Sequence, residues 1–221
     1  MSGPAPGPRR VVLATRNAHK VGELRAVLAP LLPDVQVLGV GDFADVPEVA
    51  ETGVTFEENA LLKARAVAAA TGVVAVADDS GIAVDVLGGS PGVFSALWAG
   101  RHGDDAANLR LLLAQVVDVP ERHRGASFVC AAALAAPGGE EHVVRGELRG
   151  RLSTAPAGAG GFGYDPVFVP EGSTRTLAEH GAEEKNAISH RGRAFGALAP
   201  LLAAVLDGRP IRGADGSEDP V

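Results

Sequence analysis

The sequence predicts an α/β fold in which a mixed β-sheet is flanked by helices. In the first half of the chain, short apolar strands alternate with amphipathic helices, an order typical of parallel strand–helix units. Further along, two long strand-like segments surround a Pro-Gly-Gly turn, so antiparallel strands must join the same sheet. The length of 221 residues, 46% of them hydrophobic, suits one domain or two lobes around one cleft.

The first half of the chain contains strands and helices with clear boundaries. The segment "RVVLA" predicts a buried strand, and residues 18–32 predict a helix. Apolar residues of that helix recur at the spacing of one helical face: Val21, Leu24, Val27, Leu28 and Leu31. Thr55 and Glu58 form a capping box that begins a second helix, which ends at Gly72. The segment "VVAVA", residues 73–77, predicts a short buried strand with "DDSG" at its carboxyl end.

The second half of the chain supplies the antiparallel part of the sheet. Asp104 or Asp105 begins a predicted helix, and residues 127–150 read as a hairpin. A short strand "DPVFVP" and a final helix "AFGALAPLLAAVL" follow. Residues 1–10 and 208–221 are too poor in apolar side chains to offset the entropy of ordering them, so we expect two disordered tails around a single domain at 11–207.

Charge and cysteine content exclude several classes of protein. A net charge of −7 at pH 7 repels nucleic acid and anionic membranes, so we expect neither as a partner. No segment approaches the roughly 18 apolar residues of a membrane span. The single cysteine, Cys130, excludes an intramolecular disulfide, which fits a reducing compartment and predicts a cytoplasmic protein.

The turn "TRN" before the first helix has the features of an anion site. A helix N-terminus presents free N–H groups and a positive dipole end, and Thr15 or Asn17 would cap it. Lys20 lies one turn into the helix in a chain that otherwise strongly prefers arginine, which suggests a phosphate contact. The alternative is a capped helix with a solvated lysine.

Adjacent carboxylates mark a candidate magnesium site. Asp78 and Asp79 follow an apolar strand, where alternation points neighbouring side chains to opposite faces unless the chain turns. Carboxylate oxygens are the ligands that Mg²⁺ prefers, and Glu51, just before the capped helix, would be a second ligand. The alternative is that the two aspartates only form a turn.

Two segments near the C-terminus suit the recognition of a nucleotide. In "AGAGGFGYDPVF", glycines let the backbone approach a ligand, and Phe162 or Tyr164 offers a flat face for a base. In "EEKNAISHRG", the side chains of Lys185, His190 and Arg191 suit phosphate or base. The alternatives are a plain flexible loop and a charged helix entry, respectively.

Five segments occur in an order and spacing that together identify a family: "TRNAHK", "ETGVTFEENALLKA", "ADDSGIAVDVLGGSPGVFSA", "GGFGYDPVF" and "EEKNAISHRG". They resemble the Ham1/RdgB-like family of inosine/xanthosine triphosphate pyrophosphatases, over about residues 11–207. The resemblance implies an elongated mixed α/β fold, similar to Maf and Ham1 proteins, with two lobes around a central cleft. It also implies a homodimer and Mg²⁺-dependent hydrolysis of dITP, ITP and XTP to the monophosphate and pyrophosphate, which cleanses the nucleotide pool.

The resemblance also implies roles for individual residues. Glu51 and Asp79 match the metal carboxylates of the family, and Asp79 also matches its proton acceptor. The positions that match its substrate-binding residues are Thr15, Arg16, Asn17, Ala18, His19, Lys20, Ser80, Phe162, Gly163, Tyr164, Asp165, Lys185, His190 and Arg191. In the mechanism that follows, Mg²⁺ polarises the triphosphate and Asp79 deprotonates the water that attacks the α-phosphorus. Lys63, in the family's "ENAxxKA" pattern, is expected behind these residues rather than in direct contact with substrate.

Two other functions remain open. One is a Maf-type pyrophosphatase that acts on pyrimidine or modified nucleotides, against which the "SHR" segment and the "FGYD" loop argue. The other is a nucleotide-binding module without catalysis, against which Glu51, Asp78 and Asp79 argue, since a sensor does not need a base.

Overall fold

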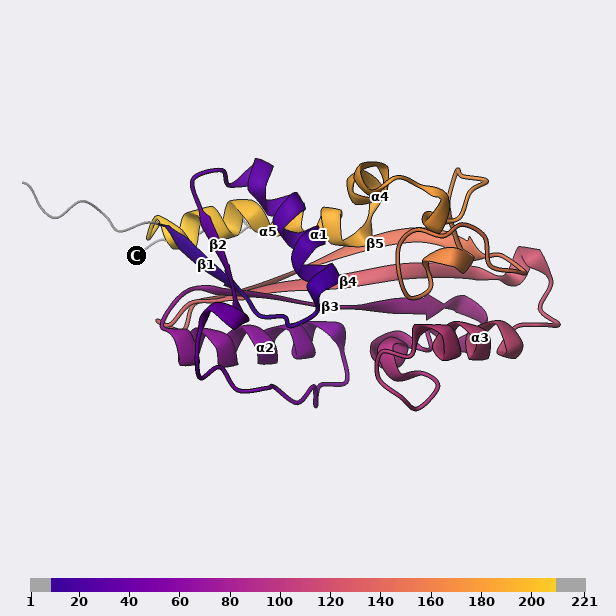
Figure 1. Ribbon diagram of the computed structural model, residues 1–221, viewed down its shortest axis with the longest axis horizontal. Helices are drawn as coiled ribbons and strands as arrows, with labels where there is room; N and C mark the ends of the chain where they lie inside the picture. The colour runs from indigo at the N-terminus through magenta and orange to yellow at the C-terminus, as the bar shows by residue number, and fades with distance from the viewer. Residues whose placement is uncertain (1–8, 210–221) are drawn as a thin grey trace, which may run out of the picture.

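The protein is a six-stranded mixed sheet flanked by helices, as the computed structural model describes it for residues 9–209. Figure 1 shows an elongated molecule whose long strands run from one lobe to the other. The strand order is β2-β1-β3-β4-β5-β6. The strands are β1 (Arg10–Leu13), β2 (Gln36–Gly39), β3 (Ala75–Val84), β4 (Gly125–Ala135), β5 (Glu141–Leu152) and β6 (Phe168–Pro170). The helices are α1 (Ala18–Leu31), α2 (Phe56–Thr71), α3 (Asp105–Gln115), α4 (Ala182–Ile188) and α5 (His190–Leu206).

The register of the sheet leaves part of one strand edge without a neighbouring strand. Strand β1 runs parallel to β2 and to β3, but it pairs only with Ala75 and Val76 of β3. On its other side, β3 pairs antiparallel with β4 along its whole length, from Ala75 to Val84. Past Val76, therefore, the first-lobe strands end and the outer edge of β3 continues into the second lobe.

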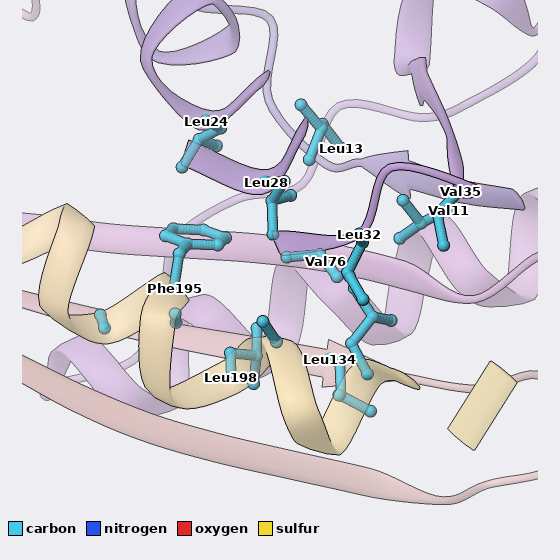
Figure 2. Close-up of a cluster of buried hydrophobic side chains, with 14 of the residues drawn as sticks. Val11, Leu13, Leu24, Leu28, Leu32, Val35, Val76, Leu134, Phe195 and Leu198 are labelled. Carbon is cyan, nitrogen blue, oxygen red and sulfur yellow. The ribbon is translucent and has the colours of Figure 1, made fainter. Parts of the chain in front are cut away.

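Apolar side chains on both faces of the sheet hold the first lobe together. Helices α1 and α5 cover one face (Figure 1), and Leu24, Leu28, Phe195 and Leu198 pack there around Val76, as Figure 2 shows. Complete burial of each such side chain contributes about 2 kcal/mol. Helix α2 covers the other face with small residues that allow close packing, among them Ala60 and Ala64.

A separate cluster forms the core of the second lobe. Leu109 and Leu112 of α3 pack with Ile82 of β3, Phe128 of β4 and the buried ring of Phe168. The sheet therefore spans both cores, and the residues between them on β3 lie where the two lobes meet.

Most predicted elements are confirmed, and three boundaries were wrong. The strand predicted at 73–77 is β3, and it continues through Asp78, Asp79 and Ser80 rather than ending before them. The final helix starts at His190, four residues before the predicted start. The segment predicted as a strand at 165–170 begins with a 3-10 turn, Asp165–Val167, before β6.

The two predicted tails lie largely outside the described residues. Arg10, where the predicted N-terminal tail and the predicted strand meet, is the first residue of β1. Within residues 9–209, no helix is both long and apolar enough to cross a membrane.

Candidate active site

A cleft lies beside the outer edge of β3, past Val76, where β1 no longer pairs with it. It consists of two adjoining cavities of about 320 and 230 Å³. The larger cavity reaches Asp79, Ser80 and Gly81 on β3, and the smaller one surrounds the start of α1. Both cavities are lined by Asn17, Lys20, Glu51 and His102.

The start of α1 forms one wall of the cleft. Asn17 caps the helix, because its Oδ1 atom accepts a hydrogen bond from the backbone N–H of Lys20 at 3.3 Å. Thr15 Oγ1 in turn accepts from the N–H of Asn17 at 3.2 Å, and Arg16 donates to the carbonyl of Val46 at 2.7 Å. Ala18 and His19 are the first two residues of the helix. The positive end of the α1 dipole thus faces the cleft.

Asp78 anchors two cationic side chains of the cleft. Its side chain is fully buried, and its Oδ2 atom lies 3.2 Å from both Lys20 Nζ and Arg191 Nε. The hydroxyl of Ser80 also donates to Oδ2, at 2.9 Å. Burial disfavours the carboxylate, but the charges of Lys20 and Arg191 outweigh burial and hold the pKa of Asp78 well below its usual range. Asp78 is therefore a buried anion that fixes both cations.

Asp79 points to the other face of β3, as strand alternation requires. The side-chain amide of Asn59 donates to its Oδ2 atom at 3.0 Å, and Asn59 is itself held by the N–H of Gly53 at 2.8 Å. Burial raises the pKa of Asp79, and the nearby Glu51 carboxylate adds to this, against the opposing charge of Lys63. A raised pKa makes the carboxylate a better proton acceptor near neutral pH.

Glu51 and Asp79 converge on one cation, the ammonium of Lys63. Lys63 Nζ lies 2.6 Å from Glu51 Oε1 and 3.9 Å from Asp79 Oδ1. The two carboxylates thus already approach one positive charge. Their oxygen atoms are also the ligands that a hard divalent ion such as Mg²⁺ prefers. Among residues 9–209, no set of three or more His, Cys, Asp or Glu side chains is arranged for a metal. Phosphate oxygens and water would therefore complete the coordination shell.

The glycine-aromatic loop, residues 157–168, places the ring of Phe162 at the cleft and buries most of the ring of Tyr164. Phe162 lies beside two cations, with Lys185 Nζ 4.7 Å and Arg191 Cζ 5.3 Å from its ring centroid. Its backbone N–H donates to Asp165 Oδ2 at 2.8 Å, and Lys185 Nζ lies 2.9 Å from the same oxygen. Tyr164 is buried, and its hydroxyl donates to the carbonyl of Ser95 at 2.8 Å.

The start of α5 also lines the cleft, on the same face of the sheet as α1. Gly146 on β5 allows this close packing, because a Cβ atom there would lie 2.2 Å from the carbonyl oxygen of His190. The His190 ring stacks on Phe128 at 4.9 Å between centroids. Burial, and then the charge of Arg191, lowers the pKa of His190 well below its usual value, so the imidazole is neutral. Its buried Nδ1 atom has no hydrogen-bond partner among the described residues.

The sequence of the chain matches a known protein family. The sequence model of the Ham1 family matches residues 11–201. The chain belongs to the Ham1 family.

Curated relatives of this Ham1-family chain include two bacterial enzymes. Over 197 residues it is 64% identical to the dITP/XTP pyrophosphatase of Streptomyces coelicolor, which covers 89% of the chain and 98% of that relative. Over 199 residues it is 57% identical to the dITP/XTP pyrophosphatase of Nocardia farcinica, which covers 90% of the chain and 97% of the relative.

Solved structures of Ham1 proteins share the fold. The nucleoside-triphosphatase / dITP/XTP pyrophosphatase of Mycobacterium abscessus is 54% identical, with a TM-score of 0.72, and the match covers 86% of this chain and 99% of that one. The HAM1 protein of Coxiella burnetii is 38% identical, with a TM-score of 0.80, and the match covers 88% of this chain and 98% of that one.

The fold brings nearly all of the residues expected from this Ham1-family sequence to one cleft. The expected residues that line it are Thr15, Arg16, Asn17, Lys20, Glu51, Asp79, Ser80, Phe162, Gly163, Tyr164, Asp165, His190 and Arg191. Lys185 lies behind this lining, where it contacts Asp165 and Phe162.

Sequence reasoning assigned no role to several residues of the cleft. Asn59 supports Asp79, and the capping pattern around it was interpreted only as a helix start. Lys63 was expected behind the residues that contact substrate, and its ion pair with Glu51 adds a specific partner that the sequence did not indicate. His102, from the segment that precedes α3, and Asp105, the first residue of α3, also line the cleft. Sequence reasoning considered Asp105 only as a helix start and gave His102 no role.

Proposed function

We propose that this Ham1-family chain hydrolyses non-canonical purine nucleoside triphosphates, such as dITP, ITP, XTP and dXTP, to the monophosphate and pyrophosphate. One observation carries the proposal: the carboxylates of Glu51 and Asp79, the cation Lys20 and the ring of Phe162 all meet at one cleft. The first three suit a polyphosphate with its metal, and the ring suits a base. The names of the relatives from Streptomyces coelicolor and Nocardia farcinica support the same substrate class.

The phosphate chain would bind at the start of α1. The helix dipole and the free N–H groups of its first turn attract anions, and Lys20 adds a full positive charge. Because Asp78 already holds Lys20 in place, little side-chain entropy is lost when a phosphate arrives. The charge that develops on the phosphate oxygens during the reaction would be stabilised from this side.

Mg²⁺ is the proposed cofactor, and Glu51 and Asp79 would hold it. A divalent ion at these carboxylates supplies charge neutralisation at the phosphate oxygens. The Lys63 ammonium keeps the two carboxylates close together before the nucleotide binds.

Asp79 is the proposed general base. Its carboxylate would take a proton from the water whose oxygen forms a bond to the α-phosphorus, while the bond from that phosphorus to the bridging oxygen breaks and pyrophosphate leaves. The raised pKa of Asp79 suits proton acceptance, and the Asn59 amide fixes the carboxylate in orientation.

Phe162 and His190 are proposed to recognise the base. Phe162 is partly exposed at the cleft, whereas Tyr164 is buried, so we assign base stacking to Phe162. The neutral His190 and the cation Arg191 would hydrogen-bond a 6-oxo purine edge. A 6-amino group would leave buried polar groups there without partners, which is the physical basis of strong discrimination.

Pyrophosphate release from dITP, XTP, dUTP and dATP, each with Mg²⁺ and with EDTA, tests the proposal. We expect Mg²⁺-dependent turnover of dITP and XTP, little turnover of dATP, and a monophosphate as the other product. Asp79→Asn should remove most turnover and leave nucleotide binding measurable. Preferred turnover of dUTP would support the Maf-type alternative, and no turnover of any nucleotide would support a binding module.

We also propose a cytoplasmic homodimer. The Ham1-family resemblance supports the dimer, and so does the apolar surface at Val54 and Phe94, whose exposed fractions of 79% and 58% are large for such side chains. The proposed substrates, nucleotides of the precursor pool, support the location. Light scattering coupled to size-exclusion chromatography measures the oligomeric state directly.

A further inference from the structure

We propose that Asp105 is a positioning residue, which orients the base-binding loop by holding the backbone of Gly163. The proposal deepens the proposed function and rests on it, because it concerns how the cleft recognises the base. Asp105 belongs to α3, far along the sequence from the loop that it contacts.

The carboxylate of Asp105 does not cap its own helix. Asp104 caps α3, since its Oδ1 atom accepts from the N–H of Ala107 at 3.0 Å. Asp105 is the first residue of the helix, and its Oδ2 atom instead accepts from the N–H of Gly163 at 3.0 Å. The side chain lines the larger cavity beside Phe162 and Gly163. A negative charge is also favoured at this end of a helix.

Three consecutive residues of the loop are each held by a different group. The N–H of Phe162 donates to Asp165 within the loop, the N–H of Gly163 to Asp105, and the hydroxyl of Tyr164 to the carbonyl of Ser95. The last two bonds join the loop to the other wall of the second lobe, formed by α3 and by the 3-10 segment Gly92–Leu97. The bond from Gly163 to Asp105 holds the peptide that directly follows the proposed stacking ring.

The bond to Asp105 matters for the orientation of the loop because the residue it holds, Gly163, is a glycine. Gly163 has φ of +61°, and nothing lies within 4 Å of the position that a Cβ atom would take. A glycine in open space has wide conformational freedom, so its peptide needs an external partner to keep one orientation. Because the bond is exposed, water can replace Asp105 at little cost to folding. Loss of Asp105 should therefore affect the orientation of Phe162 and the binding of the base, but not the carboxylates of Glu51 and Asp79.

Three variants test the proposal, with dITP kinetics as the first measurement. Asp105→Ala should raise KM for dITP roughly tenfold, the worth of one hydrogen bond to a charged group, with kcat little changed. Asp105→Asn should keep KM for dITP close to the wild-type value, because its amide oxygen can still accept a hydrogen bond from the N–H of Gly163. Asp104→Ala is the matched control. It should lower the melting temperature through loss of the cap and leave KM unchanged.

Hydrogen exchange of residues 157–165 is the second measurement, and it does not depend on activity. Exchange in this segment should be faster in Asp105→Ala than in the wild type and unchanged in Asp104→Ala. A wild type without turnover would contradict the proposed function, while the exchange comparison would still test the attachment. Unchanged exchange and unchanged KM in Asp105→Ala would overturn the positioning role. So would Asp105→Asn with the full defect, because a charge acting directly on the ligand would then be required.

Discussion

Lys63 forms an ion pair of 2.6 Å with Glu51 and so places an ammonium group beside the proposed metal ligands. Asp79 contributes to the same arrangement, at 3.9 Å from the ammonium. The charges of Asp79, Asp78 and Glu51 outweigh the burial of Lys63 and raise its pKa. The amine therefore stays protonated and competes with a divalent cation for these oxygens.

Removal of this ammonium should strengthen metal binding in the absence of nucleotide. We expect Lys63→Met to bind Mn²⁺, used as a spectroscopic probe, at least about fivefold more tightly, because a unit charge within 4 Å contributes about 1 kcal/mol even in water. Electron paramagnetic resonance of free Mn²⁺ measures the affinity. Arg65→Met is the control, since Arg65 lies on the same helix but pairs with Glu141. Equal affinity in Lys63→Met and wild type would contradict the competition.

Loss of the buried anion Asp78 should destabilise the fold. Asp78→Asn leaves Lys20 and Arg191 without their shared counter-charge, which costs about 3 kcal/mol for a buried pair. Urea unfolding at neutral pH measures the change. Asp85→Asn is the control, because Asp85 forms an exposed pair with Arg149 and its loss should cost less than about 1 kcal/mol. Similar losses in both variants would argue against the role of Asp78 as an anchor.

A methyl group at position 81 should not be tolerated. A Cβ atom on Gly81 would lie 2.4 Å from both the carbonyl oxygen of Gly92 and Ser95 Oγ, so the segment that covers β3 would have to move. We expect Gly81→Ala to lower stability by about 2 kcal/mol or more and to reduce nucleotide binding. Gly22→Ala, with open space around it in α1, should instead raise stability by about 1 kcal/mol. Thermal denaturation of both variants checks the contrast, and a fully stable Gly81→Ala would refute it.

The neutral state of His190 predicts a pH dependence of stability. The folded-state pKa of this histidine is depressed, so between that value and the unfolded value of about 6.5 the unfolded chain binds one more proton. Stability is then lost as pH falls below about 6.5, by about 1.4 kcal/mol per pH unit for this group. Urea unfolding at pH 7 and pH 5.5 should show a smaller decrease in the free energy of unfolding for His190→Gln than for the wild type. The same change at exposed His123 should leave the slope unchanged.

Local signals were sufficient to predict several elements of the fold. The capping box at Thr55 and Glu58 and the C-terminal Gly72 are confirmed, because each satisfies free backbone groups of α2 within a few residues. Asp78 and Asp79 point in opposite directions, one of the two alternatives that the sequence left open, because alternation is a property of the strand itself.

The extent of β3 and the composition of the cleft depend on distant parts of the chain. A run of Asp, Asp, Ser and Gly has low strand propensity. It becomes a strand here because β4 pairs along its whole length and because Lys20, Arg191 and Asn59 contact its two carboxylates. Likewise, Asp105 reaches the cleft only because the second lobe folds α3 against the loop at Gly163. Such contacts join residues far apart in the sequence and leave no local pattern.

The outer edge of β3 has a further consequence for how the protein avoids aggregation. An unpaired strand edge offers free amide groups to a strand of another molecule, a common route to aggregation. Here Ser95 Oγ accepts from the N–H of Ile82 at 2.9 Å, and Pro91, which has no N–H, lies opposite Ala83. The stretch of this edge at Asp79 and Ser80 lines the cleft instead, and there the N–H of Ser80 donates to Asp79 Oδ1 at 2.9 Å. The segment that closes the nucleotide cleft therefore also guards the sheet against non-native strand pairing.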